Sequence, residues 1–506
     1  MSNSNHNLTI TLNHPELQIT LYDGFGDVVA MMADDPRLER TQNSPIQVID
    51  SYSNSVTLAL PRGIYQVEGK LGGQTQSTTV RLNKDISTFA PQPNVYSAVP
   101  LSNAITSHKY YEKAAAALSH ETSSKEASIH NENQPNLVFM IRTINQAQAQ
   151  PISAHFRVLG EDNNLIFDSR INSTVQNDSQ GWLGFSLALR QGGYIVELIE
   201  EEQAQQRAIP IWLTDRFQTQ IFGLYTKGQI AYESIRLLMA NRSLGFNPQD
   251  LTLASTEIMT TSLIAGTQWL SGQSMRIALS GKFDNPIVGL FAAHTLLRRK
   301  KLNKDLLCVV IQNLEHLLGD SPDVKALKVM FKLKLHEDIA DITFNFPPTL
   351  RASYLGIVDA DSQTPSVVEE NSLFEKIGVG ICTDSPFVTW DLSQTNQPEE
   401  ALEWVKQNIV LSIATFASLP NTTPPATAEL SKTMGITQNL LQNAALSILQ
   451  SAGQQPTAGE SALDFMNHHL PTFDENHRTI LQNLDTQLLS AAETYKIICD
   501  KKYVEK

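Results

Sequence analysis

The sequence predicts a multi-domain α+β protein in which two small antiparallel β-sandwich modules precede an α-helical bundle or array. Its 506 residues exceed the size of one hydrophobic core, because such cores stop growing at roughly 250–300 residues. A segment near the N-terminus recurs at an offset of 129 positions. From residue 226 onward, apolar residues change from the spacing of strands to about 3.6, the period of helices.

The repeat aligns without a gap, and in both copies apolar positions alternate on either side of a glycine. This pattern is typical of two half-buried strands joined by a turn. Upstream of each hairpin, another alternating run ends in turn-forming residues, Asp23-Gly24 and Gly160-Glu161-Asp162. A single sheet would leave one apolar face in water, so we expect each copy to fold as a sandwich. The matched positions include Leu58, Leu60, Gly63, Tyr65, Val67, Glu68, Val80 and Leu82 in the first copy and Leu187, Leu189, Gly192, Tyr194, Val196, Glu197, Ile209 and Ile211 in the second.

Both copies carry the pattern L-x-x-G-x-Y-x-V around their central glycine. It is formed by Leu60, Gly63, Tyr65 and Val67, and by Leu189, Gly192, Tyr194 and Val196. The pattern resembles the signature of PEGA and transthyretin-like (carboxypeptidase-regulatory-like) sandwich domains, over about a third of the chain. The resemblance implies a packing or binding module without catalysis. It also implies that the tyrosine hydroxyl bonds to a neighbouring turn, in a manner similar to a tyrosine corner.

The second half is predicted to be helical. Gly319-Asp320-Ser321-Pro322 closes one helix and opens the next, and Asn285-Pro286 opens another, because glycine favours the end of a helix and Ser or Asn followed by Pro favours its start. The spacing of prolines 286 and 322 is close to a tetratricopeptide-type repeat, but too few repeats are present to close such a core, so we expect a compact bundle. The predicted helices include 230–239, 258–270, 287–297, 306–318, 324–335, 399–416 and 474–499.

These observations divide the chain into six predicted parts. The linkers are indicated by proline clusters and polar runs. The parts are a β-sandwich module at 1–90, a linker with a short helix at 91–134, a second module at 135–225, an α-helical domain at 226–417, a Pro/Thr linker at 418–428 and a C-terminal helical segment at 429–506.

Composition limits the possible functions. The net charge of −14 opposes broad association with nucleic acid or anionic membranes, both of which require clustered cations. The three cysteines are widely separated, which indicates neither a disulfide framework nor a thiolate metal site. The first ten residues lack the pattern of a secretory signal, and no apolar run approaches the ~18 residues of a bilayer span. We therefore expect a cytoplasmic protein without membrane contact, metal or cofactor.

Charge is segregated along the chain. Residues 298–334 hold nine basic and four acidic side chains, so this segment has a charge of +5 and the rest of the chain −19. Lys325, Lys328 and Lys332 are spaced to share one face of a helix. One interpretation is a solvated face with cations that complement helix dipoles; the other is a docking face for an acidic partner. This basic face consists of Arg298, Arg299, Lys300, Lys301, Lys304, Lys325, Lys328 and Lys332.

Motifs of the common hydrolases and nucleotide-binding proteins are absent from the sequence. Gly319-Asp320-Ser321 matches a hydrolase fragment, yet helix capping accounts for it. The segment 428–437 followed by a helix resembles a helix-turn-helix layout, in which Gly435 makes the turn and Thr437 caps the second helix. However, residues 438–450 contain no Lys or Arg to contact DNA. Two histidine-containing groups could hold a metal, although neither has an established ligand spacing. They are His336, Glu337, Asp338 and Asp341, and His468, His469 and His477.

The preferred functional prediction is a non-enzymatic scaffold or adaptor that binds another protein, acidic at the contact. Segments 100–108, 285–294 and 346–351 are similar to parts of uncharacterised bacterial proteins associated with caspase-like proteases. A first alternative is a hydrolase in which His294, His316 or His336 meets a carboxylate or serine only in the fold. A second alternative is nucleic-acid binding through the basic helices of 298–334. The sequence leaves the oligomeric state open.

Overall fold

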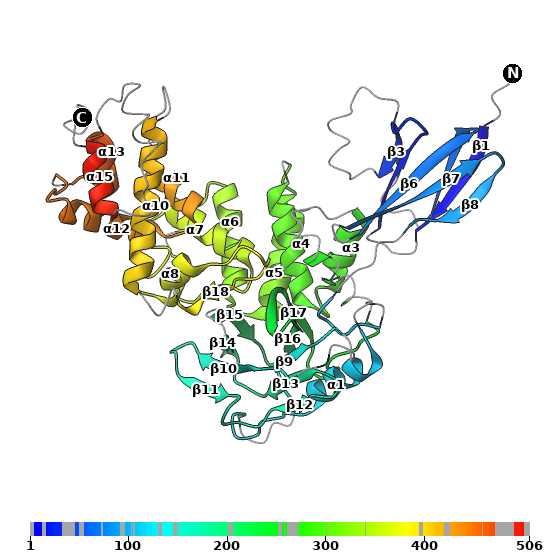
Figure 1. Ribbon diagram of the computed structural model, residues 1–506, viewed down its shortest axis with the longest axis horizontal. Helices are drawn as coiled ribbons and strands as arrows, with labels where there is room; N and C mark the ends of the chain where they lie inside the picture. The colour runs from blue at the N-terminus through cyan, green and yellow to red at the C-terminus, as the bar shows by residue number, and fades with distance from the viewer. Residues whose placement is uncertain are drawn as a thin grey trace.

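The computed structural model has β-sheets in its N-terminal half and helices in its C-terminal half, which confirms an α+β protein with a strand-rich N-terminus. In Figure 1, the two strand-rich units lie apart, and the helices extend from the second unit to the C-terminal end. The structure describes residues 5–499 except 13–16, 33–45, 50–54, 72–73, 92–96, 103, 105–106, 130–133, 145–148, 150, 201–205, most of 251–271, 300, 340, 394–397, 419–425, 458 and 471–489.

Two sheets with one shared core form the first β-unit, residues 5–90. One sheet has the strand order β5-β1-β8 and the other β4-β3-β2-β6-β7. Buried side chains of both sheets, among them Leu8, Leu21 and Val67, form a single cluster. The strands are β1 (Asn5–Thr11), β2 (Gln18–Tyr22), β3 (Val28–Met32), β4 (Gln47–Ile49), β5 (Ser55–Pro61), β6 (Gly63–Leu71), β7 (Gln74–Leu82) and β8 (Ile86–Phe89).

The second β-unit, residues 137–241, repeats this topology. Its sheet β13-β9-β16 corresponds to β5-β1-β8, and β11-β10-β14-β15 corresponds to β3-β2-β6-β7. Leu8 pairs with Leu58, and Leu137 pairs with Leu187, so the same register recurs at the offset of the sequence repeat. The strands are β9 (Leu137–Arg142), β10 (Ala154–Gly160), β11 (Leu165–Asp168), β12 (Val175–Asn177), β13 (Trp182–Leu187), β14 (Gly192–Glu200), β15 (Gln206–Leu213), β16 (Phe217–Thr226) and β17 (Gln229–Asn241).

The expected helix at 230–239 was wrong, because these residues form β17, which pairs with β16 along its length. The apolar residues alternate within 230–232 and again within 235–239, but the step between Tyr232 and Ile235 is three. The pairing of β16 with β17 shifts its register between the pairs Phe222–Arg236 and Leu224–Ala231, and the apolar residues of both runs face the same core. Because of this three-residue step, the spacing of the apolar residues over 230–239 resembles that of a helix. The helical half consequently begins later than residue 226.

The segment between the two β-units packs on the second one. The helix α1 (Lys109–His120) buries Tyr111, Ala115 and Leu118 against strands β9, β13 and β16. Arg142 is fully buried, and its guanidinium donates to the carbonyls of Ala98 and Ser97, each at 2.9 Å. The short helix expected in this segment is therefore docked on the second β-unit.

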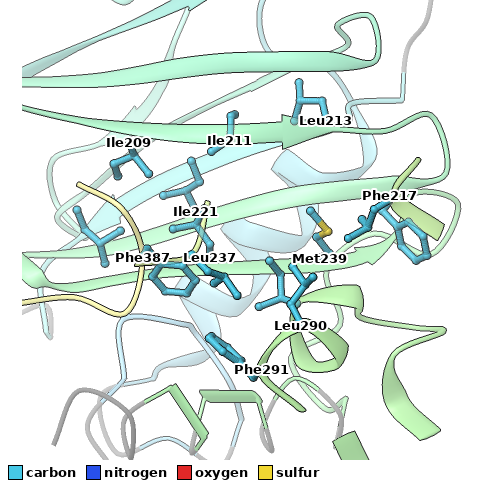
Figure 2. Close-up of a cluster of buried hydrophobic side chains, with 14 of the residues drawn as sticks. Ile209, Ile211, Leu213, Phe217, Ile221, Leu237, Met239, Leu290, Phe291 and Phe387 are labelled. Atoms are coloured by element: carbon cyan, nitrogen blue, oxygen red, sulfur yellow. The ribbon is translucent and has the colours of Figure 1, made fainter. Parts of the chain in front are cut away.

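The first helices share one hydrophobic core with the second β-unit. Leu290 and Phe291 of α4 contact a cluster that includes Ile211, Ile221 and Leu237 of the strands, as Figure 2 shows. The remaining helices form two further clusters, one of them on the outer face of β14 and β15. The helices are α3 (Gly272–Gly281), α4 (Pro286–Arg298), α5 (Lys304–Leu318), α6 (Pro322–Lys334), α7 (Arg351–Gln363), α8 (Leu373–Ile377), α10 (Pro398–Ser418), α11 (Thr427–Met434), α12 (Gln438–Ser451), α13 (Ala462–His468) and α15 (Ala491–Cys499).

A short strand, β18 (Trp390–Asp391), lies within the part that was expected to be helical and extends the β15 edge of the second β-unit. The expected helix at 258–270 lies mostly outside the described residues, as do Lys300, the core of the linker at 419–425 and most of the expected helix at 474–499. Within that last region, the structure describes the helix only as α15.

Equivalent positions of the two β-units explain why only the second carries helices on its outer face. Gln66 and Thr79 are exposed in the first unit, whereas the residues 129 positions later, Ile195 and Ala208, are buried against the helices. Replacing polar side chains with apolar ones on an outer sheet face creates a surface that must be covered. The helices that follow in the chain supply that cover.

Helix capping agrees with the sequence in two places and differs in one. The Ser321 side chain accepts from the Val324 amide at the start of α6, and the Thr437 side chain accepts from the Leu440 amide at the start of α12. Asn285 precedes α4 but makes no side-chain cap. Its side-chain oxygen accepts from the Met239 amide instead, at 3.2 Å, so it joins α4 to β17.

Candidate binding surfaces

The three lysines that were predicted to share a helical face contact neighbouring acceptors. Lys325 pairs with Asp320 at 2.9 Å, and Lys328 pairs with Glu315 at 2.5 Å. Lys332 donates to the carbonyl of Asp338 at 3.1 Å. An acidic partner at this face would therefore compete with contacts that the α5–α6 hairpin already makes, which lowers the gain from binding.

The rest of the basic face lies around the α4–α5 connection. Arg299 follows the last residue of α4, Lys301 is exposed in the connection, and Lys304 is the first residue of α5. Arg298 differs from these because it lines a pocket together with Arg351 of α7. The structure thus separates Arg298 from the lysines of α6 and joins it to an arginine that the sequence analysis did not identify.

This pocket, which we call the arginine pocket, lies between α4 and the first turn of α7. Its volume is about 100 Å³. The two positive side chains face an otherwise mainly apolar wall, and such a wall strengthens electrostatic interactions because it lowers the local dielectric constant. The lining residues are Phe291, His294, Thr295, Arg298, Leu350, Arg351, Ala352, Leu355 and Pro386.

Both arginines are perturbed by their surroundings. Arg298 is exposed as a whole residue, yet partial desolvation and the charge of Arg351 lower the pKa of its guanidinium. Burial also lowers the pKa of Arg351, although nearby Asp384 opposes this effect. The Asp384 carboxylate is itself hydrogen-bonded to Arg207, at 2.7 Å. Arg351 further donates to the carbonyl of Thr383. The arrangement therefore brings two cations together at one pocket.

A buried polar chain lies behind the pocket wall. The Nε2 atom of His294 is 2.9 Å from the hydroxyl oxygen of Ser353. The Ser353 hydroxyl also lies near the Asp323 carboxyl, where it opposes the rise in pKa that burial causes. The Asp323 carboxylate accepts from the amides of Thr349 and Leu350, at 2.8 and 3.0 Å. This chain connects α4, the start of α6 and the start of α7, and it fixes the backbone that forms the pocket.

This geometry differs from that of a hydrolase. A serine nucleophile gives its proton to histidine, and an acid orients that histidine through its other nitrogen. Here the acid lies near the serine and not at the second nitrogen of the histidine, Ser353 is fully buried, and His294 Nδ1 has no hydrogen-bond partner among the described residues. The other two candidate histidines, His316 and His336, are exposed. The sequence did not reveal the roles of Ser353 and Asp323, because no local motif links residues from three helices.

The candidate metal groups do not form a ligand cluster among the described residues. Among the residues that the structure describes, no three potential His, Cys, Asp or Glu ligands come together. His468 instead pairs with Glu460 at 2.7 Å on the surface, and His477 lies outside the described residues. The structure therefore adds no support for either predicted group.

The region with the helix-turn-helix layout packs inside the protein. Gly435 adopts a left-handed conformation after α11 (φ 69°), and Thr437 caps α12, as the sequence predicted. The first turn of α12 is bonded to α7 and α8. The Thr437 and Asn439 side chains donate to Glu375 at 3.2 and 2.9 Å, and the Gln438 amide donates to Asp361 at 3.1 Å. The end of a helix that would contact DNA bases is therefore in use as a packing contact.

An ordered turn of the first β-unit exposes an aromatic side chain. Phe25 lies at the tip of the β2–β3 hairpin and is 95 % exposed. The Asp23 carboxylate accepts from the amides of Phe25 and Asp27, at 2.9 and 3.0 Å, while Gly26 has φ 89°. A Cβ at Gly24 would be 3.5 Å from the carbonyl oxygen of Ile64, so the turn lies beside the backbone of a residue that is 55 % exposed. The sequence signal was an isolated aromatic between two glycines and two aspartates.

Two sequence comparisons, with protein-family models and with curated proteins, give no match. No protein-family model matches the chain, and no curated protein is detectably similar to it. Among the helices described, none is both long and apolar enough to cross a bilayer.

Proposed function

We propose that this protein is a non-enzymatic scaffold or adaptor in a cytoplasmic, bacterial multi-protein assembly, and that its two β-units are sandwich modules of the PEGA or transthyretin-like type. The common strand order of the two units supports the second part of this proposal. The similarity of segments 100–108, 285–294 and 346–351 to bacterial proteins associated with caspase-like proteases favours such an assembly.

The exposed Phe25 carries the proposal of protein binding. An aromatic side chain in water is unfavourable, and the hydrogen bonds of the turn hold it outward. Aromatic residues that are held rigidly lose little entropy on binding and are enriched among the residues that dominate interfaces. The corresponding β10–β11 turn of the second β-unit has only polar residues, at 161–164. The first unit therefore presents a binding tip, and the second unit anchors the helices.

The test is capture of partner proteins by the full chain in its native cells, followed by quantitative mass spectrometry. Phe25→Ser should remove the specific partner, because loss of a central aromatic weakens an interface by about 2 kcal/mol or more, roughly 30-fold. Ile171→Ser is the matched control, since Ile171 is 79 % exposed in a turn of the second β-unit. A third variant reverses Lys325, Lys328 and Lys332 to Glu and reports on the basic face.

The outcomes separate the two surfaces. Loss of the partner in Phe25→Ser alone supports binding through the tip of the first β-unit. Loss in the lysine variant alone supports the docking face for an acidic partner. Identical partners in wild type and all three variants would contradict the proposed adaptor function at both surfaces.

A further inference from the structure

The two β-units differ in how the edges of their sheets are covered. In the second unit, β18 pairs with the edge of β15, while β12 and β17 pair with the edges of β13 and β16. The corresponding strands of the first unit are β7, β5 and β8, and each of them is the last strand on its side of a sheet. Among the described residues, the first unit therefore leaves open three edges that its duplicate covers with strands of its own chain.

The longest of these three open edges is β7. It has nine residues, whereas β5 has seven and β8 has four. In an antiparallel sheet, every second residue of an edge strand directs its N–H and C=O groups away from its only neighbour. Within the described part of the chain, the backbone of β7 is hydrogen-bonded to β6 alone. A further strand along β7 would satisfy the groups that point outward.

The sequence of β7 does not protect this edge. Native proteins usually block an open edge with lysine, proline or a bulge. Residues 74–80 are all uncharged and include no proline, and the only charged residue of the strand is Arg81, near its end. The β6–β7 register is also continuous, so the strand has no bulge. By contrast, β15 contains Arg207 and Pro210, although β18 already covers part of it.

We propose that β7 pairs with β7 of a second copy of this chain, in antiparallel orientation about a twofold axis. A twofold axis perpendicular to a sheet brings a strand against its own copy only in the antiparallel direction. The same direction is observed for β18 on β15, so this fold accepts an antiparallel strand at the corresponding edge. The two five-stranded sheets then form one continuous sheet. This inference does not depend on the proposed adaptor function.

The distribution of charge favours a second copy as the occupant. The antiparallel direction places the two Arg81 side chains toward opposite ends of the interface, and uncharged side chains face each other between them. A charged segment of another protein would find only this one possible counter-charge on the strand. Residues 1–90 contain nine acidic and six basic side chains, a charge of −3, so the rest of the chain carries −11 of the total −14. Like-charge repulsion between copies is therefore weak at the first β-unit.

The experiment is sedimentation equilibrium of the purified full chain between about 1 and 100 μM, because dimerisation depends on concentration. We expect the average mass to rise toward twice that of one chain. The double variant Ser77→Lys/Thr79→Lys adds two charges at exposed positions on one face of β7. The lysines of both copies then gather on the same face of the interface, so dimerisation should weaken by about tenfold or more.

The matched control is Thr57→Lys/Ala59→Lys. It adds the same charge with the same spacing at exposed positions of β5, an edge strand of the opposite sheet. It should leave the dissociation constant within about twofold of wild type. Thermal unfolding checks that each variant is folded.

Hydrogen exchange of the wild-type protein locates the interface independently of any variant. The amides of β7, and not those of β5, should exchange more slowly at about 100 μM than at about 1 μM. This comparison decides the question even if the β7 variant does not fold.

The mass of a single chain at every concentration would overturn the proposal. A dimer that the β7 variant leaves intact, or that the β5 variant removes, would overturn the assignment of the interface to β7. Growth beyond the dimer would overturn the twofold arrangement. All of these measurements use the purified chain alone, so a failure of the partner-capture experiment would not affect them.

Discussion

The hydroxyl of Tyr194 donates to the backbone carbonyl of Arg190 at 3.0 Å. The first β-unit repeats this relationship, because the hydroxyl of Tyr65 donates to the carbonyl of Pro61 at 2.9 Å. In both units the carbonyl lies four residues before the tyrosine, in the turn that precedes the first strand of the hairpin, β6 or β14. The tyrosine hydroxyl therefore bonds to a neighbouring turn, as the sequence resemblance implied. The two bonds also lie at equivalent positions, since 61 and 65 become 190 and 194 at the offset of 129.

Removing either hydroxyl should reduce stability without changing the fold. Tyr194→Phe and Tyr65→Phe each delete one hydrogen bond and keep the ring in place, so we expect a loss of about 1 kcal/mol in each variant. Because the two tyrosines belong to separate hydrophobic cores, urea unfolding should show each variant affecting only its own β-unit. A change in the unfolding of both units by one substitution would indicate that the cores are coupled.

Exchange of equivalent residues tests why the helices cover only the second β-unit. Ile195→Gln places the polar residue of the first unit at a site that is 2 % exposed, and it should lower the free energy of unfolding by about 2–4 kcal/mol. The reverse change, Gln66→Ile, is on an exposed face of the first unit. It should alter the free energy of unfolding by less than about 0.5 kcal/mol. Urea unfolding of both variants measures the difference, and similar effects would argue against this explanation.

The planar guanidinium of Arg142 should be required to keep residues 97 and 98, which precede α1, packed on the second β-unit. It bonds to the carbonyls of Ser97, Ala98 and Thr143 and stacks over the Tyr111 ring, 4.7 Å from its centroid. Lysine keeps a positive charge but cannot reproduce this set of bonds, so Arg142→Lys should lose about 2–4 kcal/mol of stability. Limited proteolysis should then cut faster near residues 97–102. Unchanged cleavage there would show that apolar packing alone holds the segment.

The stability of the protein should decrease as the pH falls below about 6.5, partly because of His294. Burial, with a smaller effect of the Arg298 charge, lowers the pKa of His294 to about 3. Below the ordinary histidine pKa of about 6.5, the unfolded chain takes up a proton that the folded chain excludes. The contribution is constant above that pH and falls by about 1.4 kcal/mol per pH unit until the folded pKa is reached.

The comparison variant for this pH effect is His294→Gln, whose amide can still form a hydrogen bond with Ser353 but does not titrate. Urea unfolding at pH 7 and pH 5 should show that wild type loses about 2 kcal/mol more than this variant. Burial raises the pKa of Asp323, which acts in the opposite direction at lower pH. Equal losses in both proteins would mean that His294 does not exclude the proton.

Sequence patterns within a few residues correctly predicted the elements whose structure depends only on neighbouring residues. The repeat, its hairpins and the caps at Ser321 and Thr437 follow from spacing and turn chemistry within a few residues. The helix expected at 230–239 failed because a register shift, which depends on pairing with β16, altered the strand period. The packing of the helices on the second β-unit was not predicted either, since apolar spacing shows that a face is buried but not against which element.

The sequence by itself therefore determined the α+β order, the internal duplication and the excess of cations in residues 298–334. The tertiary structure decided how those cations are used. It paired Lys325 and Lys328 with acids of the same hairpin, and it brought Arg298 beside Arg351, 53 positions later in the chain. The physical reason is that charge and hydrophobicity are properties of single residues, whereas a site depends on distances that only packing between helices sets.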